Sequence, residues 1–245
     1  MNLMIYQSKQ GSDLVNAIKQ KPFVTYFLII FCILIYYHEV SLAHQFNVGL
    51  NVLYPLGCTV PLHFNPPTFK AFIKNIFTCL INPRLWQAMF LHANLMHIGS
   101  NMVFLLFIGQ ITERLFGHFR FLLLFLLSGF IGDLSSAIIG QSYSIGASTS
   151  LFGLLLAGWV LARKLHNNGL ANQLMGLFVV NIIFDFTMPD ISLWGHLGGA
   201  LAGLVLGFCL RPPFISMHPV RHKLWLQFPL SIFITFVLTG LIILL

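Results

Sequence analysis

The chain has 245 residues and a formal net charge of +7, and 57% of its residues are hydrophobic while only 8% are charged. Soluble domains carry about 25% charged residues, so this composition excludes a disordered segment, a coiled coil and an ordinary water-soluble enzyme. Together with a mean hydropathy of +0.85 it predicts a membrane protein with several spans.

Long charge-free segments separated by turn residues predict seven membrane-spanning helices, each built from about 20 mostly apolar residues. In chain order the predicted spans are 23–40, 90–112, 119–140, 147–163, 170–187, 193–210 and 225–245. A polar cytoplasmic segment, 1–22, precedes the first span, and a cytoplasmic linker, 211–224, joins the last two. No small-residue cleavage site follows the first apolar run, so we interpret that run as a retained helix.

The connection between the first two predicted spans, residues 41–89, is much longer than the others. Its apolar residues predict a segment that folds against the membrane surface, because structureless loops of this length are uncommon. Two cysteines in this loop, Cys58 and Cys79, are equally compatible with a disulfide in an oxidising compartment and with free thiols.

The basic residues predict the orientation of the chain. With the N-terminus in the cytoplasm, ten of the 13 Lys and Arg residues fall on the inner side, and only Lys70, Lys74 and Arg84 fall outside. This asymmetry is the positive-inside pattern. The inner residues are spread over four short segments, whereas a nucleic-acid footprint gathers on one face. The net charge is therefore a feature of topology, and we predict no nucleic-acid partner.

Polar residues inside the apolar spans are the candidate functional residues, because each costs about a few kcal/mol to place in a bilayer. They are His92, His97 and Asn101 in the second span, residues 146–150 in the fourth, and His196 in the sixth. These three spans run in the same direction, and each polar group lies in the first third of its span. We therefore expect one site at one depth, formed by separate helices of a bundle.

Glycines predict which of these helices touch. Gly199, Gly203 and Gly207 repeat every four residues in the sixth span, a pattern that allows a second helix to approach closely. His196 lies three residues before Gly199 on the same face. The fourth span, which begins near Ser148, is the expected partner, so the contact would bring Ser148 against His196.

A serine beside a histidine can act as a nucleophile. Its hydroxyl needs a general base to remove the proton, and a neutral imidazole can be that base near pH 7. Donors for the developing oxyanion, each contributing about 3–4 kcal/mol in a dry site, are available from Asn101, His97 and the backbone N–H of Ser148. These segments contain no Asp or Glu, so we predict a Ser-His dyad. We expect Asp133 and Asp185 to be solvated at the span ends.

Simpler interpretations exist for each of these residues. Ser148 at a helix start is an ordinary N-cap residue, and a single buried histidine often only packs. Zinc bound by His92, His97 and His196 is the competing site chemistry. We predict no metal, because about 500° of helical rotation separates His92 from His97 and no carboxylate or thiolate accompanies them.

A transporter is a further alternative, because polar residues inside spans also line transport pathways. It is disfavoured, since the two halves of the chain show no inverted repeat.

The combination of these motifs resembles the rhomboid intramembrane serine proteases over residues 23–210. The matching residues are Arg84, His92, His97, Asn101, Glu113, Gly117, Gly146, Ala147, Ser148, His196, Gly199 and Gly203. The resemblance implies an all-α polytopic membrane protein with a six-helix rhomboid core and one extra C-terminal transmembrane helix. The chain departs from the family pattern at Thr149, where Gly often follows the nucleophile, and at Pro83, where Trp usually precedes the loop arginine.

The resemblance also implies roles for the site residues. Ser148 is the expected nucleophile and His196 the expected base. The remaining site residues are His97 and Asn101 as oxyanion donors, His92 and Gly146 as their support, and Phe152 packed against the imidazole. For His92, a structural role that ties the loop to the second span is an equal alternative.

The expected activity is hydrolysis of peptide bonds in or next to transmembrane segments of other membrane proteins, without a cofactor. The expected partners are those substrates and membrane lipid. The alternative is a non-catalytic rhomboid-like protein that binds membrane proteins, although such relatives lack the serine or the histidine. We expect an integral protein of a bacterial cell membrane, with a cytoplasmic N-terminus and an active site that opens to the outer side.

Overall fold

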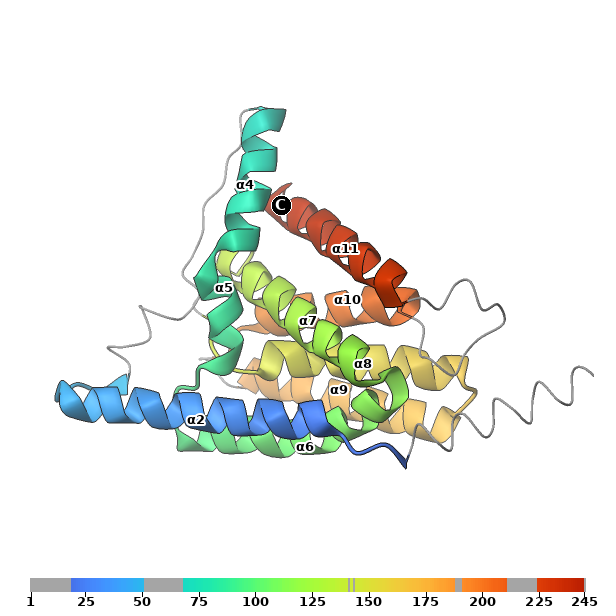
Figure 1. The fold of residues 1–245 in the computed structure, drawn as a ribbon, viewed down its shortest axis with the longest axis horizontal. Helices are drawn as coiled ribbons and strands as arrows, with labels where there is room; N and C mark the ends of the chain where they lie inside the picture. Colours follow the sequence, from blue (N-terminus) through green and yellow to red (C-terminus); the bar gives the residue numbers. More distant parts are fainter. Residues whose placement is uncertain are drawn as a thin grey trace, which may run out of the picture.

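The computed structural model describes residues 19–50, 68–140, 142, 144–187, 191–210 and 224–244. Helices occupy all seven predicted spans, as α2 (Phe23–Gln45), α6 (Leu95–Phe116), α7 (His118–Ile138), α8 (Ser148–Lys164), α9 (Asn168–Thr187), α10 (Leu193–Cys209) and α11 (Leu224–Leu244) (Figure 1). Within the described ranges α2, α6, α7 and α9 are long and apolar enough to cross a membrane. The protein is therefore an all-α polytopic membrane protein.

Helix α8 lies inside the bundle, where it packs against α6, α7, α9 and α10. Every side chain from Thr149 to Ala162 is buried except that of Trp159. A helix that is enclosed on all sides needs small or apolar residues around its whole circumference. The polar residues at its start therefore lie in the interior of the protein.

The contact between α8 and α10 depends on glycine. A Cβ added to Gly199 would overlap the carbonyl oxygen of Thr149, and one added to Gly203 would overlap the backbone of Gly153. A Cβ on Gly207 would lie 2.8 Å from the Cα of Ala157 in the same way. The predicted helix–helix contact is thus confirmed for Gly199, Gly203 and Gly207.

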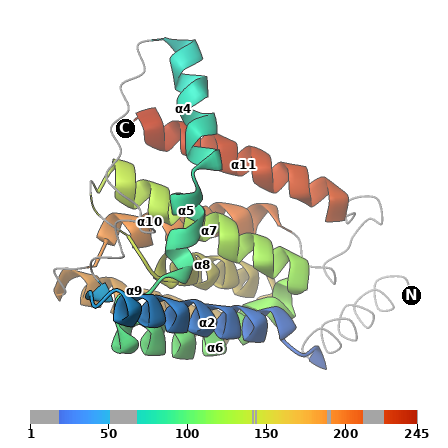
Figure 2. The ribbon, with the colours of Figure 1, turned by 60° about the vertical axis from the view of Figure 1, so that its left-hand side comes forward.

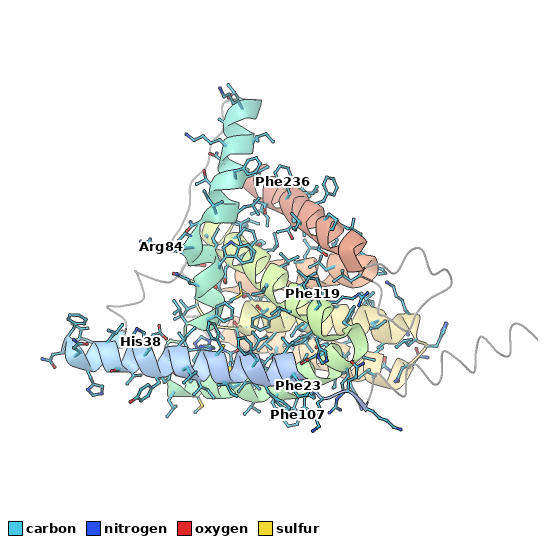
Figure 3. The ribbon with its side chains drawn as sticks, viewed as in Figure 1. Phe23, His38, Arg84, Phe107, Phe119 and Phe236 are labelled. Atoms are coloured by element: carbon cyan, nitrogen blue, oxygen red, sulfur yellow. The ribbon has the colours of Figure 1, made fainter. Side chains whose placement is uncertain are left out.

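Part of the long connection between α2 and α6 also forms helices, namely α4 (Phe69–Ile81), α5 (Pro83–Gln87) and η1 (Ala88–Phe90). Helix α4 stands away from the bundle beside α11 (Figure 2). Phe236 of α11 meets Phe77 of α4 with ring centroids 5.9 Å apart (Figure 3). Cys79 is buried in α4, but Cys58 lies outside the described residues, so the suggested disulfide stays a prediction.

Two predicted boundaries differ from the structure by five residues, and the others differ by four or fewer. The first helix continues to Gln45, five residues beyond the predicted end at residue 40. The second span begins at Leu95 rather than at residue 90, because the side chain of Asn94 caps it by accepting a hydrogen bond from His97 N–H at 2.9 Å. His92 therefore precedes the helix, and its predicted place inside the span was wrong.

The opposite end of α6 is tied to the start of α2 by the buried carboxylate of Glu113. Its oxygens accept hydrogen bonds from Val24 N–H at 2.8 Å, from Thr25 N–H at 2.7 Å and from the Thr25 hydroxyl at 2.6 Å. The first N–H groups of a helix have no intrahelical partner, and a negative charge is favourable beside them. Glu113 thus holds α2 against α6, the helix that carries His97 and Asn101.

Candidate active site

Ser148 is the first residue of α8 and follows a tight loop. Gly146 has φ +111°, a conformation that side chains rarely allow. Its N–H donates to the carbonyl of Ala88 in η1 at 2.8 Å, which fixes the loop against the long connection. The N-cap position belongs to Ala147. The hydroxyl of Ser148 is therefore not used as a helix cap.

His196 of α10 lies within hydrogen-bond distance of both Ser148 and Asp185. Its Nε2 lies 2.8 Å from the hydroxyl oxygen of Ser148, and its Nδ1 lies 2.7 Å from Oδ2 of Asp185. A carboxylate only accepts hydrogen bonds, so Nδ1 of the neutral ring carries the proton. The lone pair of Nε2 then faces the hydroxyl of Ser148, which donates to it. In this tautomer the imidazole is arranged as a base toward Ser148.

Phe152 packs on the imidazole of His196. The two rings are stacked, with centroids 4.2 Å apart and planes 15° apart. Phe152 lies four residues after Ser148 and therefore on the same face of α8. The base is thus held by a ring on one face and by hydrogen bonds at both nitrogens.

His97 and Asn101 of α6 place two donors at Gly146. The Nδ1 of His97 accepts from Ala93 N–H at 3.4 Å, so the neutral ring carries its proton on Nε2. A Cβ on Gly146 would lie 2.6 Å from that Nε2 and 3.3 Å from Nδ2 of Asn101. Both nitrogens therefore lie close to the α-carbon of Gly146, on the side where a side chain would project.

The amide nitrogen of Asn101 is buried, and it has no hydrogen-bond partner among the described residues. An unsatisfied buried donor costs about 1–3 kcal/mol, and buried polar groups are paired in most proteins. Its position beside Gly146 and near Ser148 suits an acceptor oxygen that arrives with a ligand. Two donors beside the loop that presents a serine to a base are what an oxyanion site requires.

His92 is buried in the connection before α6. Its Nδ1 lies 3.2 Å from the carbonyl oxygen of Phe90, and its backbone N–H donates to the carboxyl of Glu39 in α2. Its ring meets the ring of His97 at 5.2 Å between centroids. Burial, together with the nearby His97, lowers the pKa of His92 to about 3, so its ring is neutral near pH 7. These contacts tie α2, the connection and α6 together.

The three histidines of the zinc alternative do not form a metal-ligand set. Within the part of the chain that the structure describes, no group of three or more His, Cys, Asp or Glu side chains has a geometry suited to a metal ion. Each of these rings instead uses one or both nitrogens in hydrogen bonds to the protein.

The expectation that Asp133 and Asp185 are solvated was wrong. Asp185 is 8% exposed and contacts His196, and Asp133 is fully buried. Oδ1 of Asp133 accepts from the hydroxyl of Ser144 at 2.8 Å and faces the hydroxyl of Thr149 at 3.4 Å. Both carboxylates lie near span ends, where sequence position does not reveal whether a side chain faces water or the bundle. Asp133 therefore holds the loop around Ser148, and Asp185 holds the imidazole.

Known proteins match the part of the chain that holds this site. The Rhomboid domain model matches residues 82–213, which is more than half of the chain. The chain is 38% identical to RHOMBOID-like protein 1 of Arabidopsis thaliana over 140 residues, 54% of this chain and 36% of that protein. It is 41% identical to RHOMBOID-like protein 2 of the same plant over 142 residues, 54% of this chain and 44% of that protein.

A bacterial protein matches the same region. The rhomboid protease GluP of Bacillus subtilis is 31% identical over 133 residues, 53% of this chain and 26% of that protein. The chain spans less than half the length of each of these three relatives. The domain match, the helical bundle and the shared region together identify this chain as an integral membrane protein of the rhomboid family.

Proposed function

We propose that this chain is an intramembrane serine protease that hydrolyses peptide bonds in or next to transmembrane segments of other membrane proteins. The observation that carries the proposal is the 2.8 Å contact between the hydroxyl of Ser148 and Nε2 of His196. The Nδ1 proton of the ring faces a carboxylate, which leaves Nε2 free to accept the proton of the serine.

The first half of the reaction forms an acyl-enzyme. As the Ser148 oxygen bonds to the substrate carbonyl carbon, its proton passes to Nε2 of His196. The carbonyl oxygen becomes an oxyanion that receives hydrogen bonds from Nδ2 of Asn101 and Nε2 of His97. The imidazolium then gives its proton to the amide nitrogen of the substrate, the C–N bond breaks, and the amine product leaves.

The second half uses water. His196 removes a proton from a water molecule, whose oxygen attacks the acyl carbon through the same oxyanion geometry. The ester bond to Ser148 then breaks as the imidazolium returns its proton to the serine oxygen. No cofactor takes part in either half. A substrate helix must unwind locally, because the carbonyls of an intact helix are occupied by backbone hydrogen bonds. Family resemblance favours small residues at the cleaved position.

We also propose the domain organisation and orientation expected from the sequence. The six-span core comprises residues 23–210, the seventh helix comprises 225–245, and the basic residues favour a cytoplasmic N-terminus. With this orientation Ser148, at the start of α8, opens toward the outer side of the membrane. The kind of membrane stays a prediction, since the relatives include both plant and bacterial proteins.

Cleavage of a model transmembrane substrate by the purified full-length chain tests the proposal. Ser148→Ala and His196→Ala should each abolish cleavage, and a serine-reactive phosphonate should label wild type but not Ser148→Ala. Ser150→Ala is the matched control, because this buried hydroxyl donates to the sulfur of Met89 at 4.0 Å and follows Ser148 by about 200° of helical rotation. It should keep both cleavage and labelling.

Two results would overturn the mechanism. Cleavage by Ser148→Ala would show that this serine is not the nucleophile, and loss of wild-type activity in a chelator would revive the zinc alternative. A wild-type protein that binds the transmembrane substrate, is not labelled and does not cleave would favour the non-catalytic rhomboid-like function instead.

A further inference from the structure

Asp185 is placed unusually for a residue of α9. Its neighbours Phe184 and Phe186 are 56% and 73% exposed, as side chains that face lipid are, whereas Asp185 is only 8% exposed. A carboxylate inside an apolar span is costly, so such residues usually face the bundle interior, pair with another polar group and mark functional positions. Asp185 therefore faces the bundle on a helix whose other surfaces face the membrane.

One face of α9 leads to this carboxylate. Met175, Phe178 and Ile182 precede Asp185 at intervals of three and four residues, so the four residues share a face. The first three pack against the cluster around Phe152, and Phe178 meets the ring of Phe152 at 5.8 Å. Helix α9 lies beside α8 along this face (Figure 1). Apolar packing thus sets the rotation of α9 that directs Asp185 to the imidazole.

Of the titratable groups described around His196, Asp185 is the carboxylate that contacts its imidazole. The carboxylate contacts Nδ1 at 2.7 Å, a length typical of a charge-assisted hydrogen bond. From α6 the titratable group that faces the ring is His97, and from α8 it meets the hydroxyl of Ser148. Asp133 of α7 is directed instead to Ser144 and Thr149.

From these contacts we infer that Asp185 is a positioning residue of the proposed protease, completing a Ser148–His196–Asp185 triad where the sequence predicted a dyad. It holds the proton on Nδ1, which keeps Nε2 available to Ser148. When Nε2 takes the serine proton, the carboxylate lies against the cationic ring and stabilises it. No proton moves to Asp185 at any step. The inference rests on the proposed protease function.

Asp185→Asn tests this role in the full-length protein. The amide removes the counter-charge and allows its NH₂ group to face Nδ1, which favours the wrong tautomer. We expect kcat to fall about 10²- to 10⁴-fold, with KM changed by less than about threefold, because Asp185 acts through His196 and not on the substrate. The acidic limb of the kcat/KM profile should move to lower pH, since the imidazolium forms less readily without the carboxylate.

Two further variants separate positioning from packing. Asp185→Glu keeps the carboxylate and should retain the acidic limb of wild type and restore activity at least tenfold over Asp185→Asn. Asn181→Ala, one turn earlier on α9, removes a polar group whose amide donates to the Leu177 carbonyl at 2.7 Å and should retain wild-type kcat. Thermal unfolding and the pH dependence of phosphonate labelling at Ser148 are measured for each.

The triad would be overturned if Asp185→Asn kept the wild-type kcat and the acidic limb of its kcat/KM profile did not move. It would also be overturned if Asp185→Glu behaved like Asp185→Asn. Ser148→Ala separates failure of the proposed protease function from failure of the role of Asp185. If Ser148→Ala still cleaves, the proposed function fails. If Ser148→Ala is inactive while Asp185→Asn matches wild type in rate and pH profile, only the role of Asp185 fails.

Discussion

His97 and Gly146 face each other so closely that a Cβ on the glycine would lie 2.6 Å from Nε2 of the imidazole. The glycine also has φ +111°. The absence of a side chain therefore serves two purposes, because it permits the turn that presents Ser148 and it lets the imidazole of His97 lie directly against that turn.

Gly146→Ala should remove activity. The substitution imposes a backbone strain of about 1–2 kcal/mol, and its Cβ would overlap Nε2 of His97 and displace that donor. We therefore expect kcat/KM to fall more than about 100-fold. Gly99→Ala is the control, because a Cβ there meets nothing within 4 Å and α6 gains an alanine. Cleavage assays and thermal unfolding check both variants. Equal activity of the two would contradict an oxyanion site at Gly146.

Asn101→Leu should lower activity without lowering stability. Loss of one oxyanion donor reduces kcat by about 10²- to 10³-fold. The amide of Asn101 is buried and unpaired in the structure, so its removal relieves a cost of about 1–3 kcal/mol. The melting temperature in detergent should therefore stay the same or rise while cleavage falls. A variant that is both active and less stable would show that the amide has a structural partner instead.

Gly203→Ala should destabilise the bundle. The added methyl group would overlap the backbone of Gly153, and overpacking a close helix contact costs about 1–3 kcal/mol. Gly176→Ala makes the same change on α9, where nothing lies within 4 Å of the new Cβ. Chemical unfolding of both variants should show a loss only for Gly203→Ala. Equal stability would mean that α8 and α10 have room to separate.

His92 should make stability depend on pH. Its folded pKa of about 3 lies below the value of about 6.5 expected in the unfolded chain. As the pH falls below 6.5 the unfolded state binds a proton first, so the stability linked to His92 is complete above pH 6.5 and is lost progressively toward pH 3. His92→Gln should therefore lose less stability than wild type between pH 7.5 and pH 5. Parallel losses in the two proteins would contradict this assignment.

The sequence by itself indicated where the long apolar helices lie and which polar residues they carry. Charge-free segments predicted seven long apolar helices, because a bilayer tolerates only apolar segments of sufficient length, and a helix occupies each of these segments. The polar residues inside them were few, so Ser148, His196, His97 and Asn101 could be recognised as a group. The glycine repeat of α10 identified its partner, because only small residues allow backbones to approach so closely.

Only the tertiary structure decided which way the carboxylates face. In a membrane protein the lipid-facing and buried surfaces of a helix are both apolar, so hydrophobic periodicity does not reveal the rotation of α9. Ile183 and Ile182 are equally apolar, yet one is exposed and the other packs inside. The packing of α9 on Phe152 sets that rotation, and with it the place of Asp185 beside His196. A contact between residues on two helices depends on their crossing, which sequence spacing along either helix does not contain.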